Sequence, residues 1–175
     1  MKRLVLPVLM ALVVMTFTGI SAQLVSAQTT CTSLIAFTSN RQGNYEVFTM
    51  NPDGSNVQQI SVTTSDNYFT AWSPDGSRIS FDSNREGDFN VYAMNADGSN
   101  VVQLTTSFGE DSFGQWSPDG TQITFVSNRD GQRDIYVVNA DGSDERQLTS
   151  GSFDDNHPTW SPNGDFIAFE SDRDG

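Results

Sequence analysis

A unit that recurs without a gap along most of the chain constrains the fold more than any other feature. The residues that return every 44 positions are Trp72, Trp116 and Trp160; Ile35, Ile79, Ile123 and Ile167; and Gln59, Gln103 and Gln147. A period of about 40–50 residues with several short strands per unit is the signature of a β-propeller. The repeat therefore predicts an all-β fold in which each unit forms one blade.

Each unit is predicted to contain four short antiparallel strands joined by tight turns. Residues 79–81 alternate large apolar and small side chains, whereas residues 91–94 are apolar on both faces, as in a strand buried between neighbouring sheets. Trp116 ends another strand and is large enough to fill the space between two sheets. The Pro-Asp-Gly and Ala-Asp-Gly segments at 73–76 and 95–98 predict type I turns that close hairpins.

These residues carry a family resemblance. The motifs that carry it are W-S-P-D-G, then I-x-F-x-S-N-R-x-G and V-Y-x-M-N-x-D-G-S. Through these motifs the chain resembles the TolB-type, WD-like propeller repeat over residues 35–175. The same repeat is found in the C-terminal propeller of periplasmic TolB, in propeller domains of dipeptidyl and prolyl peptidases, and in other secreted proteins. The resemblance therefore implies four-stranded blades but leaves the function open, because one fold serves many functions.

The repeat divides the propeller part into units 35–78, 79–122, 123–166 and the beginning of a fourth at 167–175. Known propellers close with about four to eight blades. We therefore expect an incomplete ring that belongs to a longer protein. The alternative is a short protein whose open blade edges pair with a second copy, because exposed strand edges favour association.

The N-terminus has the features of a secretory signal peptide spanning residues 1–27. Lys2 and Arg3 precede an apolar run at 4–17, and 25–27 place small residues where a signal peptidase reads. An uncleaved membrane anchor is the alternative, but the apolar run is shorter than the ~20 residues that a spanning helix needs. We expect a secreted or periplasmic protein with no membrane span after cleavage.

Cleavage before Gln28 would leave a short segment, residues 28–34, ahead of the first blade. Cys31 is the one cysteine of the chain, so the sequence excludes an internal disulfide. A lipid anchor at Cys31 is a second alternative, although residues 28–30 lack the Leu-small-small pattern of a lipoprotein signal.

The chain is strongly acidic, with a formal net charge of −13. Without Lys2 and Arg3, seven arginines face 22 acidic residues, which gives −15. Such a surface repels nucleic acid and anionic membranes and favours a basic peptide or protein partner or a cation. The simpler interpretation is that the charge keeps a secreted protein soluble.

The connections between successive blades differ from unit to unit, and binding residues concentrate on variable loops held by a rigid scaffold. The predicted partner-binding residues at the mouth of the channel are Asp66, Asn67, Glu110, Asp111, Asp154 and Asp155. They would form an acidic funnel for a basic peptide, and a channel-bound divalent cation is a weaker alternative. The competing interpretation is that these side chains bond strand-end amides or arginines, or are simply solvated.

Residues repeated in every unit are predicted to be structural. They are Trp72, Trp116 and Trp160, with Arg41, Arg85, Arg129 and Arg173. We expect the arginines to pair with the hairpin aspartates Asp53, Asp97 and Asp141. His157 is the single histidine and stands where other units have Phe69 and Phe113, so it is expected to pack as those rings do.

No nucleophile elbow, phosphate-binding loop, H-E-x-x-H or calcium loop is present in the sequence. The leading hypothesis is a non-catalytic TolB-like scaffold for protein interaction, with no cofactor. The alternative is the gating propeller of a larger secreted serine peptidase of the dipeptidyl or prolyl type. A third hypothesis, a metal-dependent polysaccharide lyase, is weakened because the resemblance implies a histidine-rich site and the chain has one histidine.

Overall fold

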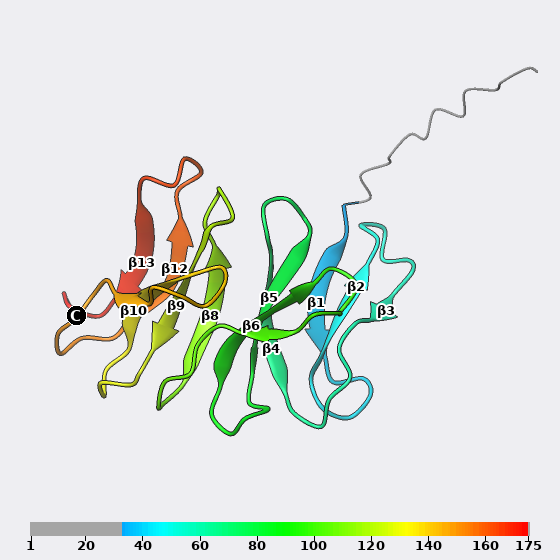
Figure 1. Ribbon diagram of the computed structural model, residues 1–175, viewed down its shortest axis with the longest axis horizontal. Coiled ribbons are helices and arrows are strands. Elements are labelled where there is room, and N and C mark those ends of the chain that lie inside the picture. The colour runs from blue at the N-terminus through cyan, green and yellow to red at the C-terminus, as the bar shows by residue number, and fades with distance from the viewer. Residues whose placement is uncertain (1–32, 175) are drawn as a thin grey trace, which may run out of the picture. The chain divides into compact units, whose positions relative to one another are not determined.

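The computed structural model describes residues 33–174, which are built from β-strands joined by turns (Figure 1). The predicted signal peptide at 1–27, its cleavage site and Cys31 lie outside the described residues. Among the residues that are described, no helix is long and apolar enough to cross a membrane.

Within residues 33–174, thirteen strands form four antiparallel sheets (Figure 1). The strands are β1 Ile35–Ser39, β2 Glu46–Met50 and β3 Gln58–Gln59; β4 Asn67–Trp72, β5 Arg78–Ser83, β6 Asn90–Asn95 and β7 Val102–Gln103; β8 Asp111–Trp116, β9 Gln122–Ser127, β10 Asp134–Asn139 and β11 Arg146–Gln147; and β12 Asp155–Trp160 and β13 Ile167–Ser171. The second and third sheets are complete four-stranded blades. Within the described residues the sheets do not close into a ring, so the predicted open propeller is confirmed for this part of the chain.

The Ser-Pro-Asp-Gly turn between β4 and β5 has the predicted hairpin geometry. Its ends are held by the pairing of Trp72 with Ile79 and by the Gly76 amide, which donates to the Ser73 carbonyl at 2.9 Å. Asp75 accepts from the Ser73 hydroxyl at 2.6 Å, which closes the turn with a charged acceptor. The turn is therefore stabilised by its own residues, and the same sequence produces it in the next blade.

The turn between β6 and β7 also contacts the preceding blade. Gly98 has a φ of 86°, and a Cβ added there would lie 2.0 Å from the carbonyl oxygen of Ile60. The Ala96 amide donates to Ser77 in the neighbouring turn at 2.9 Å. Glycine at 98 is thus required both by the backbone conformation and by the close approach of two blades.

The apolar core lies between successive sheets. One cluster joins the first two blades and contains Val47, Ile79, Phe81, Tyr92 and Met94. The other joins the second and third blades and contains Val91, Ala93, Leu104, Trp116, Ile123, Phe125, Tyr136 and Val138. Trp116 of the third blade packs in the second cluster, and Trp72 packs partly buried against the first.

Candidate binding face

The blades have two different ends, which we call the hairpin face and the loop face. The hairpin face consists of the turns at 51–55, 73–77, 95–99, 117–121, 139–143 and 161–165. The loop face consists of the turns at 40–45, 84–89 and 128–133 and of the blade-to-blade connections at 60–66, 104–110 and 148–154. Strand registers place these two sets at opposite ends of each sheet.

The first predicted acidic position lies on the loop face. It comes just before the strand that begins each blade, which we call the inner strand (β4, β8 or β12). Asp66 accepts from the Tyr45 amide and Asp154 from the Arg133 amide, both at 2.9 Å, so each ties its connection to the preceding blade. Glu110 is exposed and its carboxylate makes no hydrogen bond to another described residue. Of the three, Glu110 is the one whose carboxylate is free for an outside partner.

The second predicted position lies beneath this surface. Asn67, Asp111 and Asp155 are almost fully buried. Arg129 approaches Asp111 at 3.2 Å and Arg173 approaches Asp155 at 2.9 Å. Burial acts to raise the pKa of Asp155, but hydrogen bonds from neighbours including the Arg173 guanidinium outweigh it and hold that pKa below its ordinary value. The six predicted residues thus divide into two sets. One set lies at the surface of the loop face and the other, the buried set, lies beneath it.

Arg85, Arg129 and Arg173 bond this buried set, and Arg41 bonds Ser39. None of the four contacts a hairpin aspartate, so the predicted pairing was wrong. Arg85 donates to the Asn67 amide oxygen at 3.2 Å, in the position where Asp111 and Asp155 receive their arginines. The hairpin aspartates accept instead from serines two residues on, such as Ser99 beside Asp97 at 2.6 Å. The reason is geometric: each arginine follows β5 or its equivalent, and a six-residue strand of roughly 20 Å separates it from the hairpin face.

A row of rings crosses the loop-face end of the inner strands and touches all four sheets. This aromatic row consists of Tyr45, Tyr68, Phe69, Phe89, Phe113 and His157. Ring centroids are 4.7 Å apart between Tyr45 and Tyr68, 4.2 Å between Phe69 and Phe113, and 4.7 Å between Phe113 and His157. The expectation that His157 packs with these rings is confirmed. Its Nδ1 also lies 3.0 Å from a Glu170 carboxylate oxygen.

The inner strands present these rings because each of them is interrupted by a bulge. Phe69, Phe113 and His157 have φ values of 50°, 61° and 49°, and the pairing register shifts at each of them. A left-handed conformation is uncommon for a bulky residue. None of these three positions is itself a glycine or an asparagine, so the left-handed conformation and the exposed aromatic row were not predicted.

Part of the aromatic row lines a cavity of about 330 Å³ between the second and third blades. The residues lining it are Tyr68, Phe69, Phe89 and Phe113, with Asp82, Glu110, Ser112 and Arg133. Glu110 is the one predicted site residue that borders this cavity.

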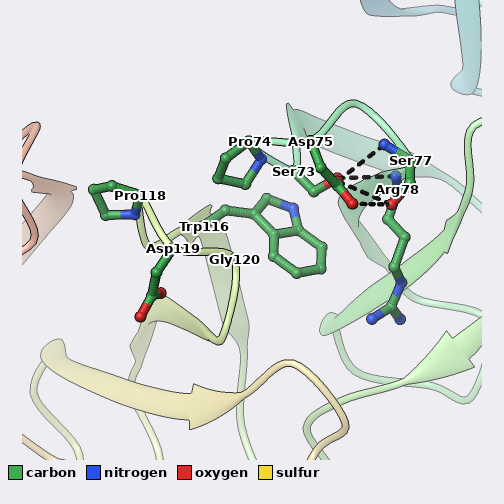
Figure 2. A pocket seen from close by; sticks show the side chains of 9 residues that line it. All are labelled: Ser73, Pro74, Asp75, Ser77, Arg78, Trp116, Pro118, Asp119 and Gly120. Carbon is green, nitrogen blue, oxygen red and sulfur yellow. Dashed lines mark hydrogen bonds between the residues drawn. The ribbon is translucent and has the colours of Figure 1, made fainter. Parts of the chain in front are cut away.

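The hairpin face has clefts of its own that repeat with the blades. Figure 2 shows one of about 380 Å³, where two Ser-Pro-Asp-Gly turns flank the Trp116 indole. Its charged side chains are already bonded. Asp75 accepts from Ser73 and Ser77, as Figure 2 shows, and Arg78 donates to the Ala140 carbonyl at 2.9 Å. A similar cleft follows one blade later around Trp160. These clefts follow from the repeat, and we attribute them to the scaffold.

Neither face gathers metal ligands. Across residues 33–174, no three acidic, histidine or cysteine side chains lie close enough together to hold a metal ion. The chemistry of the loop face is therefore that of aromatic rings and carboxylates.

A family described as the TolB beta propeller domain matches residues 26–113 and 109–175 of the chain. No match was found among curated proteins. Among solved structures, the chain is similar to a putative TolB from Agrobacterium tumefaciens, with 30% identity and a TM-score of 0.74. That similarity covers 79% of this chain and 50% of the other.

Two further structures share the fold at lower identity. TolB from Acinetobacter baumannii is 23% identical with a TM-score of 0.69, over 78% of this chain and 34% of its own. A puromycin hydrolase is 17% identical with a TM-score of 0.63, over 81% of this chain and 26% of its own. The chain spans no more than half the length of any of these three proteins.

Proposed function

Because this chain belongs to the TolB beta propeller domain family, we propose that it is a non-catalytic scaffold that binds another protein through its loop face. The observation that carries the proposal is the difference between the two faces. Hairpin turns repeat from blade to blade and bond their own polar groups, whereas the loop face varies and exposes aromatic rings beside carboxylates. Exposed rings with a polar rim are typical of protein-binding surfaces.

The connections on the loop face add apolar side chains that the scaffold does not use. Phe108 is 92% exposed, two residues before Glu110, and Phe153 is exposed in the equivalent connection of the next blade. Neither ring contributes to the two core clusters. An isolated exposed ring needs no explanation, but these two lie on the same face as the aromatic row.

We place the protein in the cell envelope or outside the cell, because its first 27 residues read as a signal peptide. The acidic surface favours a basic partner. The non-catalytic part of the proposal rests on the missing enzyme motifs and on the surroundings of His157, which pairs with Glu170 and packs edge to face with Phe113.

A capture experiment from cell-envelope extract tests the scaffold role. The loop-face variant combines Asp66→Asn, Glu110→Gln and Asp154→Asn. The amide oxygens at 66 and 154 can still accept the backbone bonds, so the change is confined to charge. We expect the wild type to retain a defined partner that this variant loses.

The matched control is Asp75→Asn, Asp119→Asn and Asp144→Asn on the hairpin face. It makes the same charge change, and asparagine already occupies each position in another repeat, at Asn163, Asn56 and Asn100. The control should keep the partner. Equal loss in both variants, or no loss in either, contradicts the proposal.

The alternative function is that of the gating propeller of a secreted serine peptidase. The puromycin hydrolase similarity supports a shared fold for that reading. Native protein purified from its source distinguishes the two, because a peptidase would react with a fluorophosphonate that labels active serines. Such labelling would replace the scaffold proposal with the peptidase one.

A further inference from the structure

The cavity between the second and third blades has the form of an aromatic cage. Four of its lining residues are Tyr68, Phe69, Phe89 and Phe113. The Tyr68 centroid is 5.6 Å from that of Phe89 and 6.1 Å from that of Phe69, and Phe69 lies 4.2 Å from Phe113. We call these four residues and the space between them the aromatic pocket. Phe69, 48% exposed, is at its opening.

A buried carboxylate lies at the base of this pocket. Asp82 on β5 is fully buried, and its Oδ2 accepts from the Phe113 amide across the blade interface at 2.9 Å. Its other oxygen, Oδ1, is buried without a hydrogen-bond partner in the structure. Burial raises the pKa of Asp82 well above its ordinary value, and the nearby charge of Asp111 raises it further. A buried acceptor left unpaired is costly, so this oxygen is available to a donor that enters the pocket.

The repeat shows that the fold does not require this carboxylate. The equivalent residues in the other units are Thr38, Val126 and Glu170. Val126 is buried at the same place in the third blade without any polar group. Asp82 is therefore a feature of one blade interface and not of the scaffold.

Two charged side chains stand at the rim. Glu110 is exposed with a free carboxylate, and Arg133 is exposed on the facing turn. With Asp82 ionised, the pocket carries two negative groups and one positive group. Aromatic faces are electronegative and attract ammonium and guanidinium groups, most strongly where water is excluded.

We propose that the aromatic pocket is a subsite for a lysine or arginine side chain of a bound polypeptide, with Asp82 pairing with its charged head. The inference rests on the proposed function, which supplies the polypeptide, and it adds the chemistry that the partner must present. Ring faces of the pocket surround the cation, displacement of the exposed Phe69 ring opens the way to Oδ1, and Glu110 adds attraction at the rim.

Nuclear magnetic resonance titration of the full chain tests the subsite. The probes are the blocked tripeptides acetyl-Gly-Lys-Gly-amide and acetyl-Gly-Arg-Gly-amide, with acetyl-Gly-Gln-Gly-amide as the neutral control. Saturable shifts of the amides of Ser112 and Phe113 are expected with the two basic peptides only. Equal shifts with the glutamine peptide, or none with the basic ones, would overturn the inference.

Variants identify the residues responsible. Asp82→Asn keeps an acceptor for the Phe113 amide and should weaken binding of both basic peptides by about tenfold or more. Glu110→Gln at the exposed rim should weaken it about twofold, and Arg133→Gln should strengthen it by a similar factor. Asp144→Asn, with the same charge change on the hairpin face, should leave binding unchanged. Unchanged affinity in Asp82→Asn, or equal weakening in Asp144→Asn, contradicts the proposal.

The rim variants keep the test decisive if Asp82→Asn does not fold, because they lie on exposed turns. Cellopentaose is a further probe, since rings and carboxylates also bind sugars; shifts with cellopentaose and none with the basic peptides would replace this inference. Loss of peptide binding in a protein that still captures its envelope partner would overturn the subsite alone. Peptide binding without any captured partner would overturn the scaffold role instead.

Discussion

The hairpin face and the loop face are built from the same repeat but use their polar groups in opposite ways. On the hairpin face, carboxylates such as Asp75 bond their own turn, and hydroxyl and amide donors lower their pKa, in this case to about 2. Near the loop face, Asp82 is buried with one oxygen unpaired, and burial raises its pKa. The hairpin carboxylates are bonded within their own turns, whereas Asp82 keeps an oxygen that the scaffold does not use.

This difference indicates how a repeat protein separates stability from function. Residues that recur in every blade are those needed to fold one unit and to pack it against the next. Asp82 and Glu110 lie at positions where the blades differ, and they stand beside aromatic rings that no core cluster contains. Substitutions should therefore affect folding at the first kind of position and binding at the second.

The largest effect is expected at the blade interface. Trp116→Ala should destabilise the protein by about 3–5 kcal/mol, because it leaves a cavity where the indole joins two blades. Phe108→Ala on the loop face should change stability by no more than about 0.5 kcal/mol. Urea denaturation of both variants measures this, and similar losses would remove the distinction between scaffold and loop surface.

The buried ion pair beneath the loop face should rank second. Arg129→Ala leaves the Asp111 charge uncompensated and should cost about 3 kcal/mol. Adding Asp111→Asn should restore part of this, since the second blade uses Asn67 at the same position. If the double variant is no more stable than Arg129→Ala, the buried charge is not the source of the loss.

Glycines at the two faces should differ by a smaller amount. Gly98→Ala places a Cβ against the Ile60 carbonyl at a positive φ and should cost about 1–3 kcal/mol. Gly87→Ala on the loop face meets open space, so only the backbone strain of about 1 kcal/mol applies. Thermal unfolding of the two variants compares them directly; a larger loss for Gly87→Ala would contradict the packing seen at Gly98.

Asp82→Asn should stabilise the protein, and the gain should depend on pH. The folded pKa of Asp82 lies above the ordinary 3.8, so ionisation opposes folding as the pH rises through the folded value. The variant should therefore gain about 1–3 kcal/mol near pH 8. The gain should vanish below about pH 3.8, where the side chain is protonated in both states. Denaturation between pH 3 and pH 8 measures it, and a gain that grows towards low pH would refute the assignment.

The smallest effect should come from Asp75→Asn, and its sign is the reverse. The folded pKa of about 2 lies below the ordinary 3.8, so the Asp75 charge contributes stability above that value and loses it as the pH falls towards 2. The variant should be slightly less stable than the wild type at pH 7 and equal to it at pH 2. A constant difference across this range would mean that the charge has no part in the turn.

Sequence alone allowed the prediction of the blades, their thirteen strands and both hairpin turns, because each depends on residues close together in the chain. The Ser-Pro-Asp-Gly sequence forms the same turn at 73–76 and at 117–120, because the turn is closed by bonds among its own residues. Sequence alone also predicted that His157 would pack with phenylalanines, since the repeat aligns their positions. Each of these features depends on residues close together in the chain, and each recurs in several units of the repeat.

The site could be predicted only in part. Glu110 lies exposed on the loop face, whereas Asp111, which was predicted to act with it, is buried and paired with Arg129. The partner of Arg129 lies 18 positions away and that of Asp82 lies 31 positions away, on another blade. The 18-residue spacing recurs for Arg85 and Arg173 but is visible only in the folded blade, and no spacing within one unit identifies the partner of Asp82.

What the sequence determined by itself is the scaffold: a 44-residue unit whose local turns and alternating strands form the same blade each time. Tertiary structure decided which polar groups remain unsatisfied and which rings face outward. The packing of adjacent blades holds Phe69 and Phe113 in left-handed bulges and places an amide of one blade over the Asp82 carboxylate of another. Both outcomes depend on contacts between units, where the energy of packing outweighs the preferences of single residues.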